Sequence, residues 1–423
     1  MRINFVSAIL LGWFGICASV SAELRWDLSG FATLGAGKTN RDSLSYMDYD
    51  EDWSVDSDTM LGLQLVVEPI DRLSVTGQVV TRGHSFGDIA DYEAELEWFF
   101  LSYDLSEQSR VRAGRLRTPY QYFSESLEVG YSYVWVRPPP NVYAFLFEPF
   151  KHFEGVDYNH IHYGDDFDTE LRLLYGRQKG TFLRTEAQIE QVWGGTVTVR
   201  WPDLSLRYAF LDHTVDFTVP DFQPLIDGLN DATVIDPGFA EIADQYSLEN
   251  GRMRYHSLAA DWRLDEWNVV AERYQLEPPD KQLNNSSQGW YISLARQMGR
   301  FTPYFVTGAY KSSMGKEMLD RIDEVYGRVE PQYPFLPPET VAGLQTLQAN
   351  AIFAYKIYVV EQRSYTLGVR YDWLSNAALK MELEYVEFAS DSTGHFIHKG
   401  EVIKGPSDPN DAMVLTLLID VVF

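Results

Sequence analysis

The sequence predicts an all-β fold, a transmembrane β-barrel of sixteen antiparallel strands, and three observations lead to this prediction. Apolar and polar residues alternate in sixteen segments along the chain. The connections between these segments are short and long in turn, and large aromatic residues gather beside the short ones. Bulk composition does not decide the class, because 45% hydrophobic residues suit a soluble protein as well as a barrel.

The alternation is clearest in the last eleven residues of the chain. One face of this segment carries Met413, Leu415, Leu417, Ile419, Val421 and Phe423. Similar stretches occur at residues 61–68, 204–210, 366–373 and 379–385. Segments of ~10 residues with one apolar and one polar face are what a barrel with lipid outside and water inside requires.

The connections between the segments alternate in length. The segments begin near residues 24, 58, 72, 92, 109, 151, 168, 187, 204, 251, 267, 288, 301, 362, 378 and 411. Short connections lie at 69–71, 106–109, 164–167, 202–203, 265–266, 299–300 and 375–376. Longer ones lie at 39–57, 83–91, 119–150, 179–186, 216–250, 277–287, 314–361 and 390–410. Outer-membrane barrels have short periplasmic turns and longer external loops, whereas a soluble β-sandwich has no reason to sort its loops this way.

Aromatic residues cluster beside the short connections. They are Trp26, Tyr103, Trp201, Trp262, Trp267, Phe301, Trp373 and Phe423. Trp and Tyr prefer the headgroup level of a bilayer, so this set is interpreted as a periplasmic aromatic girdle. The alternative is that each aromatic belongs to the core of a soluble fold.

Residues 1–22 have the pattern of a secretory signal peptide. Arg2 is followed by an apolar stretch over 5–16 and by a small-residue cleavage site at 20–22. A lipoprotein is the alternative, but Ile16 precedes Cys17 where a small residue is needed. Cleavage would leave residues 23–423 as a cysteine-free barrel domain and, because Arg2 is the only charged residue removed, would change the net charge from -26 to -27. So acidic a chain is not expected to bind nucleic acid.

The segment over residues 110–143 carries a family resemblance. It reads RVRAGRLRTPYQYFSESLEVGYSYVWVRPPPNVY. It resembles the fifth strand and third loop of trimeric general porins of the Gram-negative outer membrane, and it is similar to a porin group of marine and related gammaproteobacteria. The resemblance implies that residues 119–150 form a third external loop that folds inward and narrows the pore. It also implies a homotrimer whose partners are outer-membrane lipid, lipopolysaccharide and the outer-membrane assembly machinery.

The resemblance also implies a pore constriction. Arg115 matches the wall arginine of the family, with Arg82 and Arg117 as its neighbours, and Glu125 and Glu128 would be the loop carboxylates. Gly114 is expected to let the alternation slip so that Arg115 turns inward. The loop departs from the family pattern because aromatic residues dominate it. Glu125 and Glu128 could therefore simply face water.

The sequence contains two further candidate sites. The alternating C-terminal end resembles the signal read by the outer-membrane assembly machinery, with Phe423 as its last residue. The acidic segment 39–57 could bind divalent cations, but it lacks EF-hand spacing, so a solvated loop is the preferred interpretation. No metal site is therefore predicted.

Charges of both signs lie on the polar faces of the predicted strands. This mixture predicts a water-filled channel for passive diffusion of small hydrophilic solutes and ions. The alternative is a substrate-preferring channel, which would need a ladder of one charge sign or an aromatic track. A barrel hydrolase is the remaining alternative, but the eight histidines lie in no HExxH or nucleophile-elbow context. No catalytic residue and no cofactor are predicted.

Overall fold

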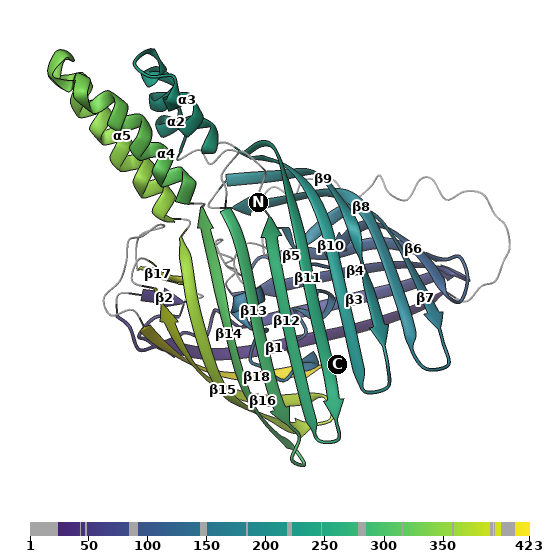
Figure 1. The fold of residues 1–423 in the computed structure, drawn as a ribbon. Coiled ribbons are helices and arrows are strands. Elements are labelled where there is room, and N and C mark those ends of the chain that lie inside the picture. The colour runs from purple at the N-terminus through teal and green to yellow at the C-terminus, as the bar shows by residue number, and fades with distance from the viewer. Residues whose placement is uncertain are drawn as a thin grey trace, which may run out of the picture.

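The computed structural model describes residues 24–42, 44–46, 49–83, 92–143, 150–182, 185–217, 222–246, 248–277, 285–314, 316–357, 359–389, 392, 394–398 and 411–423. The predicted signal peptide, 1–22, lies outside them. Sixteen of the strands form one closed antiparallel barrel (Figure 1). They are β1 (Arg25–Thr39), β3 (Met60–Ile70), β4 (Leu73–Arg82), β5 (Ala94–Asp104), β6 (Ser109–Arg117), β7 (His152–Tyr163), β8 (Asp168–Phe182), β9 (Thr185–Arg200), β10 (Leu204–Phe217), β11 (Leu248–Leu264), β12 (Trp267–Glu277), β13 (Asn285–Arg296), β14 (Phe301–Met314), β15 (Val360–Leu374), β16 (Ala377–Phe388) and β18 (Asp411–Val422).

The strand count and the connection pattern predicted from the sequence are confirmed. Each strand begins within three residues of its predicted start, and β1 closes the barrel against β18. One predicted loop is wrong, because β8 and β9 extend to residues 182 and 185 and fill most of the segment 179–186. The apolar alternation stops at the edge of the bilayer, whereas backbone pairing between two adjacent strands can continue into water.

The outer surface of the barrel is apolar. Leucines such as Leu28 on β1, Leu63 on β3 and Leu101 on β5 are about half exposed. All eight aromatic residues of the predicted girdle are exposed and lie beside the short turns. A closed barrel satisfies its own backbone hydrogen bonds, and this exterior matches lipid. The chain is therefore an outer-membrane barrel.

Two of the long external connections contain helices, whereas the sequence predicts loops there. These helices are α2 (Gln223–Asp231), α3 (Gly238–Gln245), α4 (Lys316–Val329) and α5 (Pro338–Ile357). The four helices form a bundle that projects beyond the strands, on the side opposite the short turns (Figure 1). No helix in the described part of the chain is long and apolar enough to span a membrane. The short strands β2 (Leu44–Tyr46) and β17 (Phe396–His398) pair separately and join the first external connection to the last.

This topology can be tested with single cysteines, because the chain has no cysteine besides Cys17 of the predicted signal peptide. Val234 is 89% exposed between α2 and α3, and Asp203 lies in a short turn. We expect Val234→Cys to react with a membrane-impermeant maleimide on intact cells, and Asp203→Cys to react only after the outer membrane is opened. Labelling of Asp203→Cys on intact cells would invert the topology.

Candidate functional site: a loop packed inside the barrel

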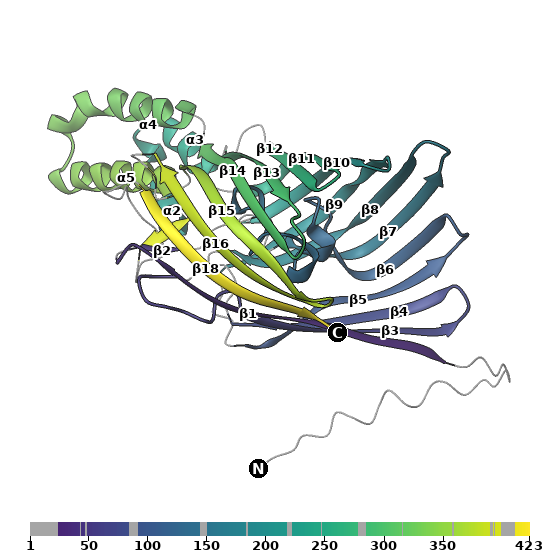
Figure 2. The same cartoon turned by 90° about the horizontal axis from the view of Figure 1, so that it is seen from below.

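The connection between β6 and β7, residues 118–151, is the third external loop, and its described part lies inside the ring of strands (Figures 1 and 2). It includes two short 3-10 turns, η1 (Ser124–Ser126) and η2 (Gly130–Ser132), and the helical turn α1 (Pro140–Tyr143). Its residues contact the inner wall on both sides of the barrel. The described part of the third loop therefore packs against the inner wall.

Aromatic side chains hold one side of the loop against the wall. Tyr255, Tyr274, Tyr291, Tyr304 and Tyr310 come from β11 to β14 and are all less than 5% exposed. The ring of Tyr120 meets Tyr255 edge-on at 5.1 Å, and Trp135 meets Tyr291 in the same way at 5.6 Å. Trp135 also donates its Nε1–H to Ser293 Oγ at 2.8 Å. The aromatic residues that set this loop apart from the family pattern therefore pack it against the wall.

The wall also approaches the backbone of the loop closely. A Cβ atom on Gly289 of β13 would lie 1.8 Å from the carbonyl oxygen of Asn141, so only glycine leaves room for α1 there. Wall cations donate to other carbonyl oxygens of the loop: Lys380 Nζ to Gly130 at 2.7 Å, and Arg370 Nη1 to Tyr131 at 2.8 Å. These contacts place the loop against β13, β15 and β16.

Arg137 connects the third loop to the first external connection. Its Nη2 donates to Asp58 Oδ2 at 2.5 Å and to Thr416 Oγ1 on β18 at 3.1 Å. The guanidinium lies 5.5 Å from the ring centre of Tyr49, and the Tyr49 hydroxyl donates to Asp58 Oδ2 at 2.5 Å. The loop is thus fixed to the side of the barrel where β1 meets β18.

On the opposite wall, charged residues at the external end of the lumen form what we call the upper cluster: Arg82, Glu97, Arg117, Glu128 and Lys151. Glu128 of the loop binds Arg117 Nη2 at 2.9 Å and Arg82 Nη2 at 3.5 Å. Glu97 binds Arg82, Arg117 Nη1 at 3.0 Å and Lys151 Nζ at 3.2 Å. The structure therefore brings Arg82, Arg117 and Glu128 together. These residues form ion pairs with one another and do not face each other across an open pore, so they anchor the loop to the wall.

Sequence reasoning missed Glu97, the central carboxylate of this cluster. The register between β4 and β5 shifts so that Gln78 pairs with Trp98 and Val79 with Leu96, which leaves Glu97 as an extra residue. This β-bulge places Glu97 on the inside, where it is 0% exposed. The sequence did carry a sign of this bulge, because the alternation of apolar and polar residues is irregular around Trp98. A strict two-residue period does not show on which side of the irregularity a residue turns inward.

Glu125 belongs to a second group, which we call the lower cluster: Arg112, Glu125, Asp157 and Arg172. Glu125 Oε1 accepts from Arg172 Nη1 at 2.7 Å and from Arg112 Nη2 at 3.1 Å. Partial removal from water inside the barrel would raise the pKa of Glu125, but Arg172 and Arg112 lower it from 4.5 to about 2. The stabilisation from these ion pairs is therefore fully present above pH 4.5 and is lost only as the pH falls toward 2.

The structure does not place Arg115 in either cluster. In the sheet register it lies opposite Phe99 and Glu154, and both of these side chains are exposed. Directly opposed residues share one face of a sheet, so Arg115 takes the outer face at the external rim. Gly114 does adopt an unusual backbone, with φ at 141°, but Leu116 next to Arg115 is the residue that turns inward and is buried. The register therefore does not support the expectation that Arg115 turns inward. Its Nη2 nevertheless lies 3.3 Å from Nδ1 of His152, and His152 Nε2 lies 2.5 Å from Glu97 Oε2 of the upper cluster.

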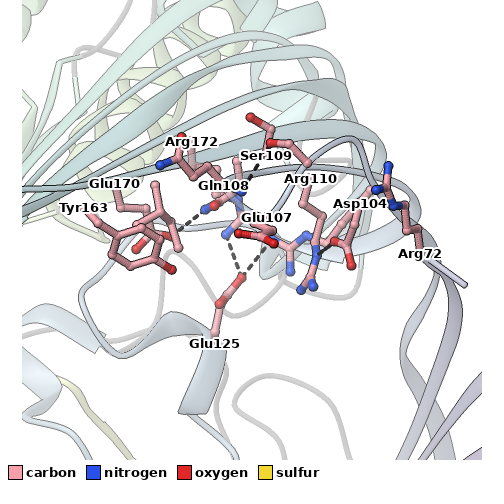
Figure 3. A pocket seen from close by; sticks show the side chains of 14 residues that line it. Arg72, Asp104, Glu107, Gln108, Ser109, Arg110, Glu125, Tyr163, Glu170 and Arg172 are labelled. Atoms are coloured by element: carbon pink, nitrogen blue, oxygen red, sulfur yellow. Dashed lines mark hydrogen bonds and ion pairs between the residues drawn. The ribbon is translucent and has the colours of Figure 1, made fainter.

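A cavity of about 500 Å³ lies below the lower cluster, at the short-turn end of the lumen (Figure 3). Its charged lining residues are Arg72, Arg110, Arg112, Arg172, Asp104, Glu107, Glu125 and Glu170. Figure 3 shows the carboxylate of Glu125 extending from the third loop toward the other lining residues, among them Arg172. In the described residues, no three His, Cys, Asp or Glu side chains form a group that could hold a metal ion.

The loop leaves little open space at the middle of the lumen. Inward-facing polar residues on widely separated strands are less than a tenth exposed. They include Arg172, Arg207, Asp261, Glu272, Ser293, Thr366, Lys380 and Asp420. The inner wall thus carries charges of both signs, and the third loop covers most of them. Any path for water and small polar solutes through this lumen would have to pass beside the loop.

Comparison with solved structures identifies the fold. The outer membrane channel DcaP of Acinetobacter baumannii aligns with a TM-score of 0.54 and 10% identity over 96% of this chain and 99% of that chain. Salmonella typhi OmpF, solved in complex with daunomycin, gives 0.53 and 11% over 94% and 97%. The trimer form of OmpT, an outer membrane protein of Vibrio cholerae, gives 0.51 and 10% over 95% and 99%. No protein-family model and no curated protein matches the sequence. The chain has the sixteen-stranded, porin-like barrel fold of outer-membrane channels.

Proposed function

We propose that the protein is an outer-membrane channel through which small hydrophilic solutes and ions diffuse passively, and that it catalyses no reaction. The observation that carries this proposal is the inner wall, where buried charges of both signs line a closed barrel whose exterior is apolar. A polar interior occurs in water-filled channels and in barrels plugged by a loop, and the polar wall here provides the surface that a water-filled path needs. The likeness to the solved channel DcaP supports the same conclusion.

A substrate-preferring channel is the second candidate. The close packing of the third loop favours it, because a narrow path discriminates among solutes more strongly than a wide one. The mixed charges of the wall favour general diffusion, since no ladder of one sign is present among the described inward-facing residues. The tyrosines of β11 to β14 do not form an open track, because the loop covers them.

We also propose that three copies assemble in the membrane, with lipopolysaccharide around their external rims. The trimer form of OmpT has the same fold, which supports the assembly. Arg177 and Glu154 pair at 3.0 Å on the outer face near the external ends of their strands, with Arg115 opposite Glu154 in the register. Basic groups at this height suit the phosphates of lipopolysaccharide.

Ion selectivity in a planar bilayer tests the channel proposal. We expect weak selectivity in the wild type, because the clusters are internally paired. Arg82→Gln with Arg117→Gln should shift the reversal potential in a salt gradient clearly toward cations, since Glu128 would lose both of its arginines and Glu97 would keep only Lys151 and His152. These charges act through little water, so their effect should be large.

The matched control neutralises carboxylates of the first external connection. Replacing Asp50, Glu51 and Asp52 by amides should change the reversal potential less, and added salt should remove the effect, because charges beyond ~8 Å are screened at physiological ionic strength. A larger shift from these loop substitutions than from the arginine pair would place the selectivity-determining region outside the upper cluster. Absence of any conductance would refute the channel.

A further inference from the structure

The two carboxylates of the lower cluster, Asp157 and Glu125, are held in different ways. Asp157 is 2% exposed and takes the Nε and Nη2 groups of Arg112 at 3.0 and 2.7 Å and those of Arg172 at 2.7 and 2.6 Å. Glu125 comes from the loop and its side chain is 49% exposed. Only its Oε1 meets the two arginines, and Oε2 makes no hydrogen bond to any described residue. Asp157 is therefore a fixed part of the wall, whereas Glu125 is the exchangeable partner.

The charges of the lower cluster favour an anion at the position that the Glu125 carboxylate occupies. Arg112 and Arg172 carry two positive charges, and Asp157 compensates one of them. Glu125 compensates the other, through a carboxylate that approaches from the loop side. A guanidinium pair is well suited to a carboxylate, because its N–H groups match the two oxygens in geometry and charge. If Glu125 moves away, the wall presents one uncompensated positive charge in a preformed geometry.

The space beside Glu125 is large enough for a solute. The cavity of about 500 Å³ reaches from Arg112 and Arg172 to the short turns. That volume lies within the range of small-molecule sites. Arg72 lines the same cavity and forms no ion pair with another described residue, so it can interact with a bound anion.

We propose that this cavity is a binding site for small solutes that carry a carboxylate, and that the solute carboxylate replaces Glu125 on Arg112 and Arg172. Glu125 thus acts as an internal competitor, attached to the loop that narrows the lumen. An anionic solute would release the loop from this wall while it binds. The role in transport rests on the proposed channel function, but the binding itself does not.

Titration calorimetry on the full-length protein in detergent tests the proposal at low salt, with succinate as the probe and succinamide as its uncharged match. Glu125→Gln removes the competitor, so succinate should bind about tenfold more tightly than to the wild type if the site is free of Glu125 about a tenth of the time. Arg112→Gln should abolish binding in the Glu125→Gln background. Succinamide should bind to none of these proteins.

The control variant is Glu107→Gln, which removes the same charge from the same cavity without touching the arginine pair. It should leave the succinate affinity within twofold of the wild type. Equal affinities of wild type and Glu125→Gln would overturn the proposal, as would an equal gain from Glu107→Gln or binding of succinamide. Because calorimetry needs no ion flow and bilayer conductance in plain salt needs no succinate, failure of the site and failure of the channel can be told apart.

Discussion

Replacing residues 122–141 by a short Gly-Ser linker should raise the single-channel conductance several-fold. The third loop covers inward-facing residues from β8 to β18, which would otherwise border an open lumen. Sixteen-stranded barrels are wide enough to leave an aqueous channel when nothing fills them. The measurement is the conductance of single channels in a planar bilayer in molar salt, where charge effects are screened.

The control replaces the external helices at 223–245 and 317–356 by linkers of the same kind. These helices project beyond the strands, so their loss should leave conductance nearly unchanged (Figure 2). Heat-modifiable migration in gels verifies that both variants form barrels. An unchanged conductance in a correctly folded loop variant would mean that the third loop does not limit the path.

Deleting Phe423 should sharply reduce the amount of barrel inserted in the outer membrane. Its backbone N–H donates to Gly30 O at 2.9 Å, and Gly30 N–H donates to Phe423 O at 2.7 Å, so this residue closes the seam between β18 and β1. Its ring lies over Gly30, where a Cβ atom would meet it at 2.6 Å. The deletion removes both hydrogen bonds and the aromatic side chain that the assembly machinery is expected to recognise. Protease-resistant, heat-modifiable protein in outer-membrane fractions is the measurement.

Phe423→Ala separates the two contributions to this effect. It keeps the backbone closure and loses only the ring, which is 61% exposed and contributes little to packing inside the barrel. If recognition of the ring dominates, the alanine variant should insert as poorly as the deletion. If closure dominates, it should insert nearly as well as the wild type. Normal insertion of the deletion variant would contradict both roles.

The barrel could be predicted from the sequence because its determinants are local. Whether a residue of a strand faces lipid or water depends on its parity, so the pattern at Leu61, Leu63 and Leu65 is visible without knowing any partner strand. The short turns can also be recognised without knowing any partner strand, because connections of so few residues can only be tight turns between adjacent strands. The inward position of the third loop, by contrast, came from a family resemblance and not from periodicity.

The partners of the charged residues were not readable in this way. Arg172 could be placed on a polar face, but its contact with Glu125 depends on how the loop folds across the lumen. The inward position of Glu97 depends on a β-bulge that the sequence does not reveal. The face taken by Arg115 depends on its register against Phe99, which is likewise not visible in the sequence. The helix α4 did carry a local signal, since Met318, Ile322, Val325 and Val329 are spaced for one helical face and all are buried. The sequence prediction assigned the whole connection 314–361 to a loop because of its length, so this helical spacing was not used.

The helical bundle limits which external connections of this protein can be exchanged separately during evolution. A surface loop that packs only on itself can be exchanged without its neighbours. Here Phe239 of α3 meets Tyr326 of α4 edge-on at 5.1 Å, and Arg328 of α4 pairs with Asp236 before α3 at 2.9 Å. Tyr246 after α3 donates to the carbonyl oxygen of Ala351 in α5 at 2.6 Å. Two connections far apart in the sequence therefore share one core. A recombination event or graft that exchanges only one of them would expose the apolar face of the other, so the pair should be inherited and engineered as a single unit.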